Sequence, residues 1–204
     1  MLSSSAAISL LCLVLFINPV PISSQQTTPA VLDTAGHAIK SNTRYFILPA
    51  GAKSGGGPTL VNHNSSCPSS IGQDIRVGSR GLPVIFTPSS SETTVRESSD
   101  FTIRFNVTTA TCVESTEWAL VDWPASTGRT LIKTTTRATS TAHSTVTAYL
   151  KIERQGKYYK LVWCPSNLCP RCTPRCGDVG VYVEKNVRLL ALYEPALSIV
   201  FRKA

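Results

Sequence analysis

Apolar residues recur at every second position along several short stretches of the chain, and helical spacing is nearly absent. The range 147–153 shows this alternation, and 158–163 repeats it after a turn at Gly156. A period of two is that of a half-buried β-strand, with one face in the core and one in solvent. The two ranges therefore predict a β-hairpin.

Similar stretches, rich in β-branched and aromatic residues, recur along the chain between Gly, Pro, Ser, Asn and Asp residues. Their spacing predicts an all-β sandwich or barrel. No loop has the length or monotony of an interdomain linker, so we expect a single domain over 25–204. The predicted strands are Tyr45–Leu48, Thr59–Asn62, Pro83–Phe86, Phe101–Val107, Glu117–Val121, Thr130–Thr134, Val146–Glu153, Tyr158–Cys164, Val179–Val183, Val187–Leu192 and Ser198–Phe201.

The N-terminus has the pattern of an export signal. An apolar core over 6–17 is followed by two prolines and the small pair Ser23 and Ser24. We expect a signal peptide over 1–24, cleaved after Ser24, and a secreted protein, extracellular (apoplastic) or vacuolar. The alternative is a membrane anchor, which the short apolar stretch and the lack of a basic flank disfavour.

Composition excludes a mostly disordered chain, because 42% of the 204 residues are hydrophobic and only 16% are charged. Beyond the N-terminus no apolar run is long enough to cross a membrane. The formal charge is +8, from 20 Lys and Arg against 12 Asp and Glu, and it is spread from Lys40 to Lys203. Without basic runs or interleaved aromatics, no nucleic-acid partner is expected. A solvated basic surface is the simpler interpretation, and an anionic partner or cell-wall polymer is the alternative.

Seven cysteines are present, of which Cys12 leaves with the signal. Six in an oxidising compartment predict disulfides rather than zinc ligation or redox chemistry, the two alternatives for the closely spaced group at 164–176. Nested pairing of that group, Cys164 with Cys176 and Cys169 with Cys172, suits a hairpin-like excursion and leaves Cys67 for Cys112. Two sequons, at Asn64 and Asn106, are predicted glycosylation sites in an exported chain.

Motifs for catalysis are scarce. The three histidines stand in no metal-binding pattern, and no serine sits in a nucleophile-elbow motif. The glycines at 55–57 lack the surrounding frame of a phosphate-binding loop. The sequence therefore predicts a protein that is not an enzyme and that needs neither a metal nor a cofactor.

Several separated segments, in order, resemble the plant Kunitz-type (soybean trypsin inhibitor-like) protease inhibitors. The opening segment and two strands that bracket an inhibitory loop are similar, as are the surroundings of three cysteines. The four cysteines at 164–176 resemble the miraculin-like branch, in which nested pairing is also usual. The segments are Val31–Ile39, Tyr45–Ile47, Cys67–Pro68, Gly81–Val84, Phe101–Phe105, Tyr159–Pro165, Cys176–Gly180 and Leu189–Leu192.

The resemblance implies a β-trefoil, a six-stranded barrel capped by hairpins with pseudo-threefold symmetry, here with three disulfides. It also implies that the chain binds a protease as a substrate would, through an exposed loop within 87–94. Aligning Cys67, Gly81 and Phe105 with trypsin-inhibiting members places Ser91 at the primary specificity position and Glu92 just after it. The predicted inhibitory-loop residues are Pro88, Ser89, Ser90, Ser91, Glu92 and Thr93.

Trypsin-directed members carry Arg or Lys at the primary specificity position, to pair with the acid in the protease pocket. Ser91 cannot form that pair, so we expect weak trypsin inhibition. Arg96, five residues further on, is the alternative specificity residue. Asn42 lies one position beyond the place of a loop-supporting Asn in the family, and it is equally well explained as a turn residue before Tyr45.

Two functions of different class follow from the resemblance. The first is inhibition of an endopeptidase, with a serine protease preferred and cysteine or aspartic proteases as alternatives. The second is a non-inhibitory trefoil that binds carbohydrate, a small ligand or a receptor, or that serves in storage. In both cases we expect a monomer that contacts neither nucleic acid nor membrane.

Overall fold

A computed structural model describes residues 28–51, 54–63, 67, 69–108, 113–121, 129–136, 146–164 and 176–204. The predicted signal peptide lies outside these ranges. Within them the chain forms strands and no helix, so no described helix could span a membrane. The strands are β1 (Arg44–Pro49), β2 (Pro58–Val61), β3 (Ser70–Gln73), β4 (Val84–Pro88), β5 (Phe101–Phe105), β6 (Val113–Val121), β7 (Leu131–Thr136), β8 (Val146–Thr147), β9 (Leu150–Gln155), β10 (Tyr158–Trp163), β11 (Gly177–Glu184), β12 (Val187–Leu192) and β13 (Ile199–Lys203).

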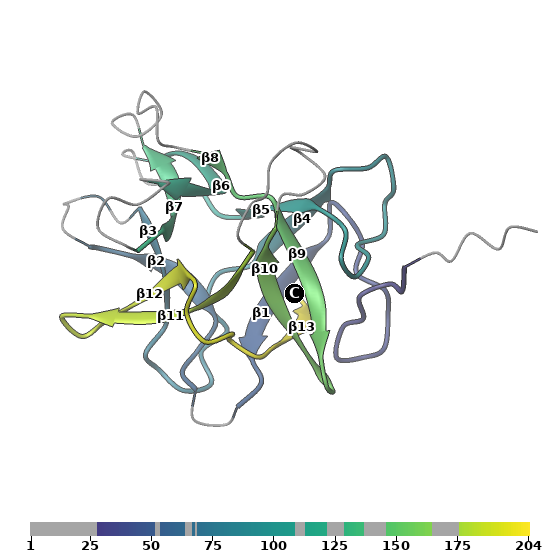
Figure 1. Ribbon diagram of the computed structural model, residues 1–204, viewed down its shortest axis with the longest axis horizontal. Helices are drawn as coiled ribbons and strands as arrows, with labels where there is room; N and C mark the ends of the chain where they lie inside the picture. Colours follow the sequence, from purple (N-terminus) through teal and green to yellow (C-terminus); the bar gives the residue numbers. More distant parts are fainter. Residues whose placement is uncertain are drawn as a thin grey trace, which may run out of the picture.

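Six strands close into a barrel. Antiparallel pairing runs from β13 through β1, β4, β5 and β9 to β10, and β10 pairs with β13 to complete the ring. The closing pair joins Tyr159 to Ile199. In Figure 1 these strands lie together on the right of the molecule. Because the sheet closes on itself, the six strands leave no free edge between them.

Three hairpins cap one end of this barrel: β2–β3, β6–β7 and β11–β12. Their strands β3, β7 and β12 also pair with one another, so that the hairpins form a triangle. Each third of the chain thus contributes two barrel strands and one cap hairpin. This pairing gives the pseudo-threefold arrangement of a β-trefoil, which confirms the predicted fold.

Most strand boundaries lie within two residues of the predicted ones, and three differences are larger. β3 was not predicted, because it is short and contains two polar residues, Ser70 and Gln73, that are nevertheless buried. Gly72 belongs there because a Cβ atom would lie 2.5 Å from the carbonyl oxygen of Arg188. β6 begins earlier than expected, and the predicted strand 146–153 is two strands, of which β8 pairs with the cap and β9 with the barrel.

Aromatic side chains fill the barrel. Phe86 lies at the centre of this group, with its ring centroid 5.5 Å from that of Phe101 and 5.6 Å from that of Phe201, both edge-to-face. Tyr45 lies 6.1 Å away on the neighbouring strand. All four residues are buried, and they come from four adjacent strands. Their packing therefore joins the barrel strands into one core.

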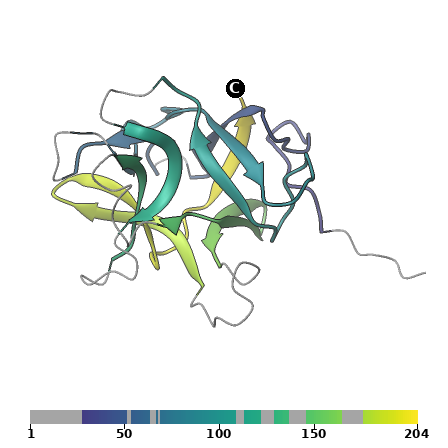
Figure 2. The same cartoon turned by 90° about the horizontal axis from the view of Figure 1, so that it is seen from above.

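The end of the barrel away from the hairpins is covered by two segments, the N-terminal stretch 28–43 and the β4–β5 connection (Figures 1 and 2). Three apolar side chains from these segments, Val31, Ile39 and Val95, are almost completely buried and belong to the core. Main-chain hydrogen bonds link the segments to the barrel, for example from the Thr34 amide to the Phe201 carbonyl at 2.8 Å.

Cys164 and Cys176 form a disulfide that joins the end of β10 to the start of β11, as predicted. Cys67 is also disulfide-bonded, but its predicted partner Cys112 lies outside the described residues. The predicted pair of Cys169 and Cys172 lies outside them as well.

The aromatic core sets a stability prediction. Replacing Phe86 by Ala should lower the free energy of unfolding by about 3–5 kcal/mol, because it removes a fully buried ring and leaves a cavity. Thr87→Ala, on the exposed next position of the same strand, should change it by less than about 0.5 kcal/mol. Urea unfolding followed by tryptophan fluorescence measures both, and equal losses would contradict this account of the core.

Candidate functional site

The predicted inhibitory loop, 87–94, begins with the last two residues of β4 and continues into the β4–β5 connection, 89–100. Its base is fixed where Pro88 pairs with Phe101 and where the Ser89 amide donates a 2.9 Å hydrogen bond to the Asp100 carbonyl. The five residues 89–93 are all exposed, whereas Val95 is only 1% exposed. The chain therefore leaves the barrel, presents a short polar run to solvent and returns to the core at Val95.

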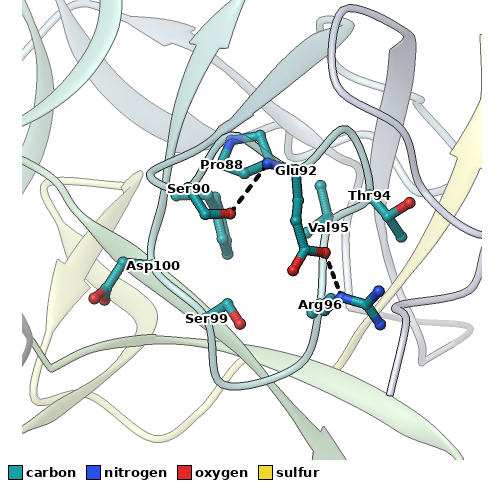
Figure 3. Close-up of a pocket in the computed structure, with 9 residues that line it drawn as sticks. Pro88, Ser90, Glu92, Thr94, Val95, Arg96, Ser99 and Asp100 are labelled. Atoms are coloured by element: carbon teal, nitrogen blue, oxygen red, sulfur yellow. Dashed lines mark hydrogen bonds and ion pairs between the residues drawn. The ribbon is translucent and has the colours of Figure 1, made fainter. Parts of the chain in front are cut away.

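Residues of the loop alternate between its inside and its outside. Pro88, Ser90, Glu92 and Thr94 line the space beneath the loop, as Figure 3 shows. Ser89, Ser91 and Thr93 do not line it and are exposed. The cavity holds about 20 Å³, enough for one water molecule, so the loop has little room to collapse inward. Ser91 consequently stands on the outer side of the loop.

Glu92 and Arg96 brace the loop from within. The Arg96 Nε donates to the Glu92 carboxylate, and the Glu92 amide donates to the Ser90 hydroxyl at 3.4 Å (Figure 3). Arg96 Nη1 also donates to the Thr28 carbonyl at 2.9 Å. Because two of its guanidinium nitrogens, Nε and Nη1, donate to Glu92 and Thr28, Arg96 acts in this structure as a brace, and the Glu92 carboxylate is directed back into the loop.

The N-terminal segment holds the second half of the loop through the main chain. Val95 donates to the Ile39 carbonyl at 3.0 Å and accepts from the Val31 amide at 3.0 Å, so that it is bonded on both sides. The Ser41 amide donates to the Thr93 carbonyl at 2.8 Å. These hydrogen bonds fix the backbone immediately after Glu92.

Two ion pairs hold the returning limb of the loop to β9. Arg154 donates through Nη2 to Glu97 at 2.6 Å, and this hydrogen bond is the main cause that raises the pKa of Arg154 above its usual range. The same guanidinium stacks over the Tyr159 ring at 4.8 Å. Further along, Lys151 Nζ lies 3.8 Å from the largely buried Asp100 carboxylate. Both cations are thus neutralised where the loop rejoins the barrel.

The predicted loop support and modification sites fall in different places. Asn42 lies in the turn before β1, with a φ of 56° and an exposed side chain, one residue from the Ser41 amide that holds the loop. This position is that of a turn residue, and its role in loop support stays a prediction. Asn106 follows β5 and is half-buried, and Asn64 lies outside the described residues, so glycosylation at both stays a prediction.

Sequence reasoning missed the side chains that brace the loop. Glu97 and Arg154 are 57 residues apart in the chain, and neither belongs to a motif. Only the hairpin at 150–163, once placed beside the loop, brings them together. Within the described ranges, no three His, Cys, Asp or Glu side chains gather as a metal site would require.

Comparisons with known proteins agree with this architecture. Residues 31–203 match the family model described as "Trypsin and protease inhibitor". The chain is 38% identical to Kunitz type trypsin inhibitor 104 of Medicago truncatula over 85% of its length and 87% of that protein's. It is 31% identical to miraculin of Synsepalum dulcificum, covering 91% and 88%.

Among solved structures, the bifunctional alpha-amylase/subtilisin inhibitor of rice (Oryza sativa) superposes with a TM-score of 0.69 at 32% identity. The match covers 87% of this chain and 99% of that one. The family consists of protease inhibitors and not of enzymes. The match to its model spans nearly the whole described chain, from the N-terminal segment to β13. This chain therefore belongs to the plant Kunitz family of protease inhibitors.

Proposed function

We propose that the chain is a secreted inhibitor of an endopeptidase and that its binding site is the loop 87–94. One observation carries the proposal: the exposed run 89–93 is fixed on both sides by hydrogen bonds while its interior is nearly filled. A loop already held in one shape loses little conformational entropy when a protease binds it, and this raises affinity. A contact of standard size, about 1,600 Å² in total, needs only the loop and its surroundings.

The residue that enters the specificity pocket of the protease is Ser91. It is exposed and stands on the outer side of the loop, and Glu92 after it is directed inward by Arg96. A short, uncharged side chain suits a protease with a small or shallow pocket, of elastase or subtilisin type. It gives the acid at the floor of a trypsin pocket no partner, so we propose that trypsin is inhibited only weakly. The subtilisin named for the rice relative is of the favoured kind.

A panel of purified proteases tests the proposal. Subtilisin, pancreatic elastase, trypsin, papain and pepsin are each titrated with the mature protein, and residual activity is measured. We expect a stoichiometric complex with at least one serine protease of small-pocket type. Failure to inhibit every member at micromolar concentration would contradict inhibition and favour a trefoil that binds carbohydrate, a small ligand or a receptor.

Changing the specificity residue should change the target. Ser91→Arg should tighten trypsin binding at least about a hundredfold, because the new cation pairs with the acid in a desolvated pocket. Ser89→Arg, also on the outer side of the loop, is the matched control and should have little effect. Inhibition constants for trypsin, measured with a chromogenic substrate, compare the two variants. Equal gains in both variants, or none in either, would contradict Ser91 as the specificity residue.

The braces should matter for inhibition more than for stability. Glu97→Gln weakens the charge-assisted hydrogen bonds from Arg154 that hold the returning limb. We expect affinity for the inhibited protease to fall about tenfold, equivalent to about 1.4 kcal/mol, and cleavage within 87–94 to become faster. Inhibition constants and mass spectrometry of the protease-treated protein measure these effects.

Glu153→Gln provides the control for that change. Glu153 lies on β9 next to Arg154, and it pairs with Lys160 at 3.4 Å rather than with the loop. It should leave both affinity and loop cleavage as they are. If both variants lower the thermal midpoint equally and neither changes inhibition, Glu97 does not position the loop.

A further inference from the structure

The outer surface of one side of the barrel carries cations without acids. Strands β1, β4, β5 and β13 contain no Asp or Glu, whereas β1, β5 and β13 carry Arg44, Arg104 and Arg202. Arg80, just before β4, lies with its guanidinium carbon 5.1 Å from the centre of the Phe46 ring on β1. All four arginines are exposed. We call this group, Arg44, Arg80, Arg104 and Arg202, the arginine face.

The strand register places these residues on one surface. Arg44 is opposite Ile85, and Ile85 is opposite Arg104, so the two arginines lie on the same row across three strands, about 10 Å apart. Arg202 is opposite Phe46, two residues further along β1 and on the same side of the sheet. With Arg80 above the Phe46 ring, the four side chains form a continuous basic surface.

The other side of the barrel is different. There the cations of β9 and β10 are matched by acids: Arg154 by Glu97, Lys151 by Asp100, and Lys160 by Asp178. In the ring of barrel strands, β9 and β10 lie across from β1 and β4, and in Figure 2 they are the green segments in the lower part of the barrel. In the described part of the chain, no arginine of the arginine face lies within ion-pair distance of an acid. Even Glu117, opposite Arg104 on β6, does not reach it.

Packing explains why long side chains cover this surface, but it does not explain why they are not paired with acids. The aliphatic parts of Arg44 and Arg104 flank Ile85, which is only 6% exposed, and Arg80 covers Phe46. Such shielding works equally well when the guanidinium is paired with a neighbouring acid. Four like charges on one surface repel one another, which costs stability unless an anion binds there. The uneven distribution therefore points to an anionic partner.

We propose that the arginine face binds a linear acidic polysaccharide with a carboxylate on each sugar. Planar guanidinium groups pair with carboxylates in a bidentate manner, and a row of them on an open sheet suits an extended chain of repeated carboxylates. Nucleic acid fits less well, because single strands need exposed aromatic rings for stacking, and the ring of Phe46 is covered by Arg80. The proposal depends on the export that the sequence predicts, because such polymers are extracellular.

This surface is separate from the inhibitory loop. It lies along the outside of β4 and β5, whereas the loop is the connection at their end. None of its four residues contributes to the hydrogen bonds or ion pairs that brace the loop. The protein could thus remain attached to an acidic matrix while the loop meets a protease, and the two activities can be lost independently.

Affinity measurements with polygalacturonate as the probe test the proposal. The mature protein is titrated with polygalacturonate and with its fully methyl-esterified form at 50 and 150 mM NaCl. We expect binding to the acidic form alone, weaker at the higher salt concentration because paired counterions are released. The triple variant R44Q/R104Q/R202Q should bind at least about tenfold less tightly and with a smaller salt dependence.

Two further variants serve as controls. K133Q/K157Q/K185Q removes the same charge from scattered positions on β7 and on the β9–β10 and β11–β12 turns, and it should keep the affinity within about twofold. R44K/R104K/R202K keeps the charge and should retain most of the binding. If the Gln variant does not fold, as judged by its thermal midpoint, the single changes Arg44→Gln and Arg104→Gln replace it, and each should weaken binding.

Three outcomes would overturn the proposal. Equal losses in the arginine-face and scattered variants would mean that net charge alone governs binding. Equal binding of the acidic and methyl-esterified polymers would mean that the carboxylates are not recognised. Tighter binding of duplex DNA or of anionic lipid vesicles than of polygalacturonate, at equal charge concentration, would assign the surface to another class of partner.

Discussion

The main chain of Val95 is hydrogen-bonded to the N-terminal segment on both sides, and its side chain is almost completely buried in the core. This single residue joins the loop, the segment 28–43 and the barrel. Without it, the exposed run 89–93 would be the tip of a long flexible connection, and protease binding would cost the conformational entropy lost when that connection becomes ordered. With it, only five residues project from a fixed frame. The fixed shape of the loop is therefore a consequence of core packing at its far end.

Electrostatics divides the barrel into two sides with different roles. Around the loop, Glu92, Glu97 and Asp100 are each matched by a cation, so the local charge is used to hold the backbone. Along the outside of β1, β4, β5 and β13, by contrast, no arginine of the arginine face forms an ion pair with an acid among the described residues. The net charge of +8 is thus not distributed evenly over the surface. Its uneven placement distinguishes the surroundings of the braced loop, where cations are paired with acids, from the arginine face, where they are not.

Local pattern was sufficient for most of the strands, because alternation in 147–153 and 158–163 marks strands wherever one face is buried. It did not distinguish a trefoil from a sandwich, and the trefoil was expected from the family resemblance. It failed at β3, where Gln73 is buried and Gly72 is required by close backbone contact, since neither has a strand-like signature. The position of the loop could be predicted from its flanking strands. Its braces could not, because the pair of Glu97 and Arg154 depends on tertiary closure of the barrel and on no motif.

We propose that the loop presents Ser91 to a protease as a substrate would, in a shape that resists cutting. Mapping the cleavage site tests this proposal. The protein is incubated with a stoichiometric amount of the protease it inhibits, and the fragments are identified by mass spectrometry over hours. The account predicts one slow cut, after Ser91, with the protease still inhibited. A first cut elsewhere in the chain, or rapid cutting with loss of inhibition, would contradict it.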